Sequence, residues 1–202
     1  MNTAAARKKL YLLLGSVMLA TAAFGFRLAV NAQMAPQPNR FKSRENSAST
    51  SAGDWKLYVN KAYKYRIEYP PVASLDESRA SKVSIEFIQE WESRGSKGTA
   101  RLSFDINVSD NHGRLTAREW ALKQWEADFI RERQDVSIDG VPGYNLKIFE
   151  FDQYSNHIYL AKRTSMYELS FSNPETISEF TPDIQRQYRE LFQKMVSSFH
   201  LQ

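Results

Sequence analysis

The stretch Leu102-Ser103-Phe104-Asp105-Ile106-Asn107-Val108 decides the fold class of this chain. Large apolar side chains alternate with polar ones, which is the period of a β-strand with one buried face and one solvated face. The stretch Val83–Phe87 repeats the alternation, and a loop with two glycines, Glu92 to Thr99, separates the two. We therefore expect these stretches to pair as an antiparallel hairpin.

Further strand signals lie on both sides of this hairpin. Residues 55–59 and 65–69 alternate around a turn at 60–63, and Val136 and Ile138 lead into an Asp139-Gly140 turn. Three more strands are expected at 144–151, 157–163 and 166–171. Consecutive strands joined by short turns predict an antiparallel sheet.

Two helices are expected. Thr116 and Glu119 have the spacing of a capping box. A broad apolar face follows them at helical spacing, formed by Ala117, Trp120, Ala121, Trp125 and Phe129. The second helix starts near Thr181 with Pro182 in its first turn. Its apolar face consists of Ile184, Tyr188, Leu191, Phe192, Met195 and Phe199. The expected fold class is therefore α+β, a central antiparallel β-sheet with helices packed on it.

The first 32 residues have the pattern of an export segment. Arg7, Lys8 and Lys9 precede an uncharged run from Leu10 to Phe26, and small residues at Val30-Asn31-Ala32 suit cleavage before Gln33. The run is slightly long for a cleaved signal and slightly short for a membrane span, so residues 1–32 are either a signal peptide or an N-terminal membrane anchor. The expected location is extracytoplasmic, in the periplasm, at the cell surface or in the thylakoid lumen.

Residues 33–53 are rich in Pro, Ser, Ala and Asn and are expected to form a flexible polar linker before a single domain at 54–202. The chain has a net charge of +4, but residues 1–53 hold seven basic residues and one acidic residue. The domain therefore carries 20 basic and 22 acidic residues, a net charge of −2. A basic footprint for a phosphate backbone is absent, so we expect no nucleic-acid partner.

Signs of catalysis are weak. Cysteine is absent, which excludes disulfides, thiolate zinc sites and thiol nucleophiles. The segment from Ser93 to Thr99 contains Gly, Lys and Thr, but it lacks their phosphate-loop order and lies between two strands. No Gly-x-Ser-x-Gly motif occurs, and no nucleophile–base pair can be named. We expect no catalytic residues, no cofactor and no enzymatic activity.

Four elements resemble the PsbP-like superfamily. Tyr58–Pro70 looks like its first β-hairpin, with an aromatic residue, Asn, a turn, an alternating strand and Tyr-Pro. Val136–Gly143 is similar to a mid-domain turn, and Tyr167–Phe171 to the last strand. The segment Met195–Phe199 resembles the end of the last helix with its closing Ser-Phe. The resemblance covers the chain from about residue 55 to residue 201.

This resemblance implies a central antiparallel sheet between helical layers. It also implies a non-catalytic domain that binds a protein or a membrane-protein complex, since most known members bind proteins and a few bind metal ions such as calcium weakly. In a photosynthetic host the implied role is association with photosystem II. Function is carried by sites rather than by folds, so the resemblance names no partner. An exported domain that binds a small ligand or a divalent metal is the alternative.

Three residues are candidate site residues. Asp110 and His112 lie in one turn and could supply two metal ligands, although Asn111-His112-Gly113 is also ordinary turn chemistry. Trp91, between Glu90 and Glu92, is a candidate protein-contact residue if it is exposed. Two other histidines, His157 and His200, are expected to have structural or solvent roles. The carboxylates Glu68, Glu86, Asp105 and Glu150 are expected on solvated sheet faces.

Overall fold

The computed structural model describes residues 54–202 with the exception of Arg94. The expected export segment, residues 1–32, and linker, residues 33–53, lie outside the described residues. The strands are β1 (Lys56–Asn60), β2 (Tyr65–Tyr69), β3 (Ser74–Arg79), β4 (Lys82–Ser93), β5 (Ser96–Asp110), β6 (Ile130–Ile138), β7 (Val141–Glu150), β8 (Gln153–Lys162), β9 (Ser165–Ser172) and β10 (His200–Leu201). The helices are α2 (Ala117–Gln124) and α3 (Pro182–Ser198), with short 3-10 turns η1 (Ala127–Phe129) and η2 (Pro174–Thr176).

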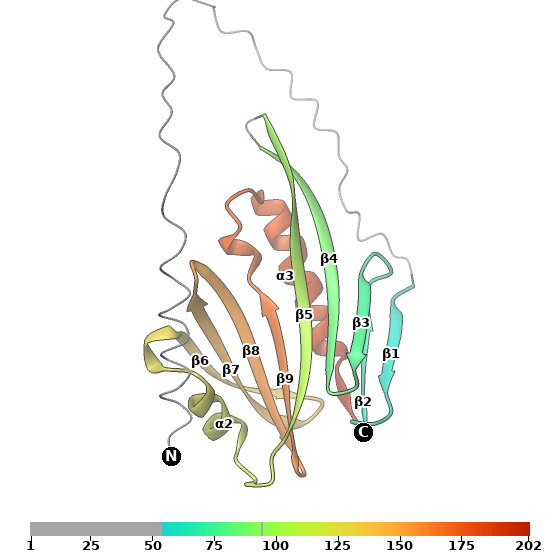
Figure 1. The fold of residues 1–202 in the computed structure, drawn as a ribbon, viewed down its shortest axis with the longest axis vertical. Coiled ribbons are helices and arrows are strands. Elements are labelled where there is room, and N and C mark those ends of the chain that lie inside the picture. The colour runs from blue at the N-terminus through green and yellow to red at the C-terminus, as the bar shows by residue number, and fades with distance from the viewer. Residues whose placement is uncertain (1–53, 94) are drawn as a thin grey trace, which may run out of the picture. The chain divides into compact units, whose positions relative to one another are not determined.

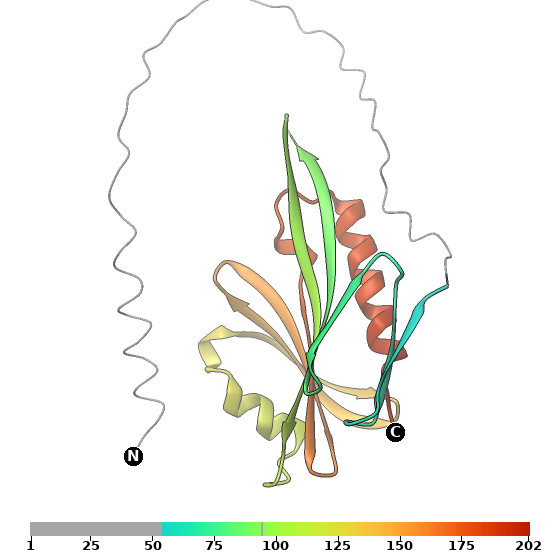
Figure 2. The ribbon, with the colours of Figure 1, turned by 45° about the vertical axis from the view of Figure 1, so that its right-hand side comes forward.

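Two antiparallel sheets organise this part of the chain (Figure 1). The large sheet has seven strands in the order β3-β4-β5-β9-β8-β7-β6, and the small sheet has three in the order β1-β2-β10. In a second view of the ribbon, the large sheet runs between α2 and α3 (Figure 2). The α+β class and the central antiparallel sheet with packed helices are confirmed.

Helix α3 covers one face of the large sheet. Alternate side chains of β4 and β5 on this face, including Ile85 and Phe104, are fully buried. The ring of Phe192 on α3 lies 5.7 Å from that of Phe87 and 5.2 Å from that of Phe171. Such ring contacts add to the gain from apolar burial. Most of the face expected for this helix is confirmed, with Tyr188, Leu191, Phe192 and Met195 buried.

Helix α2 packs against the opposite face, over β7 and β8. Its expected capping box is present, because Glu119 N–H donates to Thr116 Oγ1 at 3.2 Å and Thr116 N–H donates to Glu119 Oε2 at 2.9 Å. The expected helical extent to Phe129 is wrong, since Trp125 is extended (φ −118°, ψ 135°) and ends the helix. Trp125 and Phe129 still pack against the core beneath α2, with Phe129 held by η1. Their burial, rather than a continuing helix, explains the apolar spacing.

Several elements were not anticipated from the sequence. The long loop expected at 92–99 is instead strand, since β4 and β5 remain paired as far as Ser93 and Ser96. Strand β3 lacks the alternation of apolar and polar residues that would predict a strand, and Leu75 is its only half-buried residue. Strand β10 is two residues long and exists through backbone pairing of His200 and Leu201 with β2. These elements depend on partners distant in the chain rather than on local pattern.

Buried Asn60 closes the first hairpin. Its Oδ1 accepts from Tyr63 N–H at 2.9 Å, and its Nδ2 donates to the Ala80 carbonyl at 2.8 Å and to the hydroxyls of Tyr58 and Tyr65 at 3.3 Å. A buried amide needs such partners, because an unpaired polar group loses its hydration without replacement. The Asn of the Tyr58–Pro70 motif therefore joins the small sheet to the loop after β3.

Gly143 marks a close approach of backbone in the large sheet. A Cβ at this position would lie 2.7 Å from the Tyr159 carbonyl oxygen and 2.5 Å from Leu160 Cδ2. Backbone atoms cannot move aside as a flexible side chain can, so only glycine fits. The Asp139-Gly140 turn before it is confirmed, with positive φ angles of 53° and 73°. Together these residues set the pairing of β6, β7 and β8.

Candidate functional site

The sheet face that carries α2 is divided into two halves. Beneath α2 lie buried side chains, among them Tyr144, Leu146 and Tyr159. On β4 and β5, and on β9 beyond buried Met166, the same face is mostly polar and partly exposed. We call this second region the open half-face, and it comprises Ser84, Glu86, Ser103, Asp105, Asn107, Glu168 and Ser170.

Strand register brings these residues together in rows. One row across the sheet runs from Ser84 through Asp105 and Ser170 to His157. The next row joins Asn107, Glu168 and Tyr159. Residues directly opposite one another on neighbouring strands lie on the same face, so each row is a line of adjacent side chains. Of the four carboxylates expected on solvated sheet faces, Glu68 is exposed, and Glu86, Asp105 and Glu150 are partly exposed.

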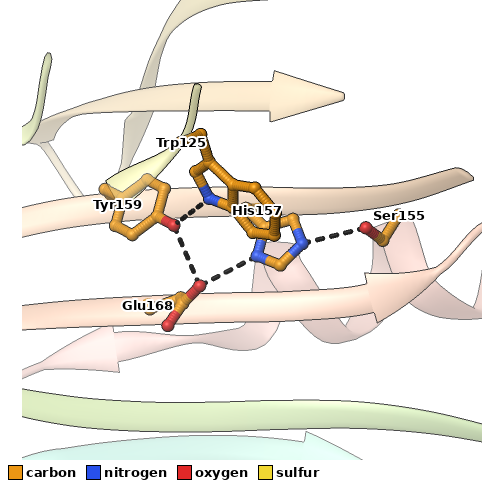
Figure 3. Close-up of polar contacts among 5 residues, drawn as sticks. All are labelled: Trp125, Ser155, His157, Tyr159 and Glu168. Carbon is orange, nitrogen blue, oxygen red and sulfur yellow. Dashed lines mark hydrogen bonds and ion pairs between the residues drawn. The ribbon is translucent and has the colours of Figure 1, made fainter. Parts of the chain in front are cut away.

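A chain of hydrogen bonds lies at the border between the two halves (Figure 3). Trp125 Nε1–H donates to the Tyr159 hydroxyl at 2.9 Å, and that hydroxyl donates to Glu168 Oε1 at 3.0 Å. The same carboxylate oxygen lies 2.8 Å from His157 Nδ1. His157 Nε2 lies 2.9 Å from Ser155 Oγ, and the Trp125 ring packs against the imidazole with 4.7 Å between centroids.

With a neutral His157, these contacts have one consistent assignment of protons. An ionised carboxylate only accepts, so Nδ1 of His157 must carry the hydrogen that faces Glu168. In a neutral imidazole the other nitrogen, Nε2, then accepts, and Ser155 O–H donates to it. Glu168 Oε1 thus accepts hydrogen bonds from both His157 and Tyr159, and the Ser155 hydroxyl donates to the other side of the His157 ring.

The environment of Glu168 keeps it ionised. Burial by itself would raise the pKa of this carboxyl, but hydrogen bonds from His157, Tyr159 and Asn107, together with the positive charge of His157 when it is protonated, outweigh burial and lower the pKa below 4.5. The side chain of Glu168 is 25% exposed and that of His157 is 13% exposed. Burial and the neighbouring carboxylate both raise the pKa of Tyr159, so Tyr159 stays protonated and donates. Glu168 is therefore an ionised carboxylate whose charge is stabilised by the groups that donate hydrogen bonds to it.

The order serine, histidine, carboxylate is that of an activated serine nucleophile. In such sites the imidazole takes the serine proton, and the carboxylate holds the imidazole in the right tautomer. Sequence reasoning missed this group, because Ser155 and His157 fit no known motif. The sequence did contain a signal, because Ser155, His157 and Tyr159 occupy every second position of one strand and therefore lie on one face. The turn at residues 163–164 then places Glu168 opposite Tyr159 on the next strand.

The metal candidates lie in an exposed turn away from this group. Asp110 Oδ2 and His112 Nε2 are 4.0 Å apart, and their side chains are 79% and 83% exposed. Buried Asn111 orders the turn by accepting from Leu115 N–H and donating to the Leu115 carbonyl, both at 2.9 Å. Within the described residues, no three His, Cys, Asp or Glu side chains converge as metal ligands. The structure thus provides two neighbouring candidate ligands and a turn built by Asn111.

Trp91 lies on the β4–β5 hairpin, whose tip projects past the neighbouring strands (Figure 1). Its side chain is half-buried and packs against the main core. The indole ring lies over Gly98, where an added Cβ would come within 2.5 Å of the ring. The exposed apolar residue of this hairpin is instead Ile88, which is 67% exposed and opposite Arg101 on the α2 side of the sheet.

A further histidine–carboxylate pair and a cavity lie elsewhere in the domain. His200 Nδ1 lies 2.9 Å from Asp139 Oδ1, which ties β10 to the turn before β7. A cavity of about 340 Å³ at the β6–β7 edge is lined by Glu132, Arg133, Gln134 and Asn145. Asn145 Oδ1 is buried there without a hydrogen-bond partner among the described residues. Across residues 54–202, Arg94 aside, no helix is long and apolar enough to cross a membrane.

Comparisons with known proteins give a fold similarity at low identity. The solution structure of cyanobacterial PsbP (CyanoP) from Synechocystis sp. PCC 6803 is 13% identical, with 75% of this chain and 96% of that chain covered and a TM-score of 0.46. A Pseudomonas aeruginosa protein of unknown function, described as a putative regulator, is 14% identical, with 72% and 96% covered and a TM-score of 0.42. A Bacteroides thetaiotaomicron structure is 13% identical, with 74% and 48% covered and a TM-score of 0.43. No family model and no curated protein matches the chain.

Proposed function

We propose that this chain is an exported, PsbP-like domain that binds another protein or a membrane-protein complex outside the cytoplasm. Residues 1–32 deliver it and, if retained, hold it at the membrane, while residues 33–53 act as its linker. In a photosynthetic host, the specific form of this role would be association with photosystem II. The proposal is supported by the export pattern, by the residues that resemble the family and by the open half-face.

One observation carries the binding role. Ile88 is 67% exposed on the α2 side of the projecting hairpin, and charged residues of both signs surround it. Arg101 lies directly opposite Ile88 and is 3.8 Å from Glu86, which belongs to the open half-face. An apolar side chain inside a charged rim is the usual arrangement of a protein interface. Mixed charge also suits a protein partner better than a nucleic acid.

Photocrosslinking in membranes of the native host tests this role. The full-length chain would carry a benzophenone amino acid in place of Ile88, with a matched probe in place of Phe151, which is 87% exposed at the β7–β8 turn. We expect one discrete protein adduct from position 88 and none of the same mass from position 151. An added Arg101→Glu substitution should weaken the adduct, because it reverses a rim charge.

Equal adduct patterns from both positions, or no adduct from position 88, would overturn the binding surface. Intact mass of the chain purified from the same membranes tests delivery separately. A mass that begins at Gln33 shows a cleaved signal, and a mass that includes residues 1–32 in the membrane fraction shows an anchor. Recovery of the full chain in the cytoplasmic fraction would contradict export.

A further inference from the structure

We propose that Ser155 is an activated nucleophile that accepts an acyl group from carboxylic esters, with His157 as its general base and Glu168 as the positioning residue. This activity is additional to protein binding. It uses a different part of the α2 side of the large sheet. It rests on side chains of β8 and β9, whereas the proposed interface is on the β4–β5 hairpin.

The geometry around Ser155 is that of a hydroxyl held ready to lose its proton. Its Oγ lies 2.9 Å from Nε2 of His157, within the range expected for a nucleophile and its base. Nδ1 of the same ring lies 2.8 Å from Glu168, so the imidazolium formed by proton uptake would meet a carboxylate. The Trp125 ring against the imidazole limits its rotation and keeps Nε2 toward Ser155.

Tyr159 strengthens the arrangement from the other side. Its hydroxyl donates to the Glu168 oxygen that also accepts from His157, and Trp125 donates to that hydroxyl in turn. Charge-assisted hydrogen bonds of this kind are stronger than neutral ones, and they fix the carboxylate in one rotamer. Trp125 and Tyr159 thus orient the Glu168 carboxylate, Glu168 orients His157, and His157 contacts Ser155.

The surroundings of Ser155 indicate the substrate class. Ser155 is partly exposed, with Ser172 directly opposite it on β9, and the open half-face continues from there with Ser170 and Asp105. Because Ser172 is directly opposite Ser155, its hydroxyl is the candidate donor to a developing oxyanion. A floor of hydroxyls and carboxylates suits a small ester with a polar acyl group rather than a long hydrocarbon chain.

The reaction balances without any added cofactor. The Ser155 oxygen forms a bond to the ester carbonyl carbon while its proton passes to Nε2 of His157. The tetrahedral intermediate then expels the alcohol, which leaves with that proton, and the acyl group stays on Ser155. Water repeats the sequence with His157 as base, which releases the carboxylic acid and restores the hydroxyl.

A fluorophosphonate probe tests the nucleophile without knowledge of the natural ester. Attack by Ser155 forms an oxygen–phosphorus bond and releases fluoride, and the labelled peptide is located by mass spectrometry. We expect labelling at Ser155 in the full chain and its loss in Ser155→Ala. His157→Ala should slow labelling by about 10²- to 10⁴-fold, the usual contribution of a general base.

Two controls keep the result interpretable. Ser137→Ala changes an exposed serine on β6, outside the open half-face, and should leave the rate unchanged. Glu168→Gln removes the carboxylate but keeps an acceptor oxygen, so it should slow labelling less than His157→Ala does, and Glu168→Asp, which restores the carboxylate, should recover part of the rate. Thermal unfolding would establish that each variant is folded. Labelling spread over several serines, or equal rates for the native chain and His157→Ala, would overturn the proposal.

Discussion

The two faces of the large sheet are built from the same alternating strands but have different surroundings. On the α3 side, β4, β5, β8 and β9 contribute one continuous core, with Val83, Leu160 and Leu169 all fully buried. On the α2 side, an eight-residue helix packs mainly over β7 and β8, and the face beyond is mostly polar. A helix of that length is about 12 Å long and cannot cover seven strands spaced about 4.8 Å apart. Helix length therefore decides how much of a sheet face becomes core and how much is left for a site.

The largest expected effect tests the α3 face. Phe192→Ala should lower the free energy of unfolding by about 3–5 kcal/mol, because it opens a cavity among Phe87, Phe104 and Phe171. A urea titration measures the change. The control is Leu122→Ala on α2, where the side chain is 38% exposed and the expected change is within about 0.5 kcal/mol. Similar losses in both variants would mean that the two faces do not differ as described.

A smaller effect, dependent on pH, tests the border of the open half-face. Glu168→Gln should cost about 1–3 kcal/mol near neutral pH, because a charged acceptor of hydrogen bonds from His157 and Tyr159 is lost. The folded-state pKa of Glu168 is lowered from 4.5, so its contribution is complete above that pH and is lost as the pH falls through the lowered value. The two stability curves, measured by urea titration at several pH values, should converge in acid.

The matched control is Glu86→Gln on the same face, where the side chain is 33% exposed. We expect it to cost less than Glu168→Gln near neutral pH, because the Glu86 carboxylate lies 3.8 Å from the exposed side chain of Arg101 and such exposed ion pairs contribute little. A constant difference between the native chain and Glu168→Gln down to pH 2 would show that the carboxylate is not stabilised by its donors.

The smallest expected effect compares neighbours on one strand. Ser103→Ala should change the free energy of unfolding by no more than about 0.5 kcal/mol, because Ser103 lies on the open half-face and bonds only to the partly exposed Asp105 in the described structure. Phe104→Ala, one residue along, removes a fully buried ring and should cost about 3–5 kcal/mol. Comparable costs in the same denaturant titration would contradict the difference between the faces.

Much of the fold could be predicted from local signals. The alternation of Leu102 to Val108, the Thr116–Glu119 capping box and the Asp139-Gly140 turn all appear as expected. Each depends on residues within a few positions of one another. Strands β3 and β10 and the end of α2 could not be predicted, because backbone pairing and packing with distant segments form them.

The candidate site likewise combines features that the sequence shows with contacts that only the fold creates. The types of residue on each strand are evident in the sequence, including Ser155, His157 and Glu168. Their meeting depends on the register of β8 with β9, and Trp125 joins them from a helix end 34 residues before Tyr159. Asp110 and His112, which are adjacent enough in sequence to be noticed, lie 4.0 Å apart in an exposed turn. Ser155 and His157 have the same spacing in the sequence and lie 2.9 Å apart, so spacing alone does not distinguish the two pairs.

The sequence by itself determined the alternation of the strands, the helix starts, the basic leading segment and the nearly neutral charge of the domain, because each is a property of neighbouring residues or of composition. Only the tertiary structure decided which part of the α2 face is covered and which is open. It also decided that a serine, a histidine and a carboxylate share one hydrogen-bond chain. The physical reason is that register and helix placement minimise exposed apolar area summed over the whole domain, so no local segment specifies them.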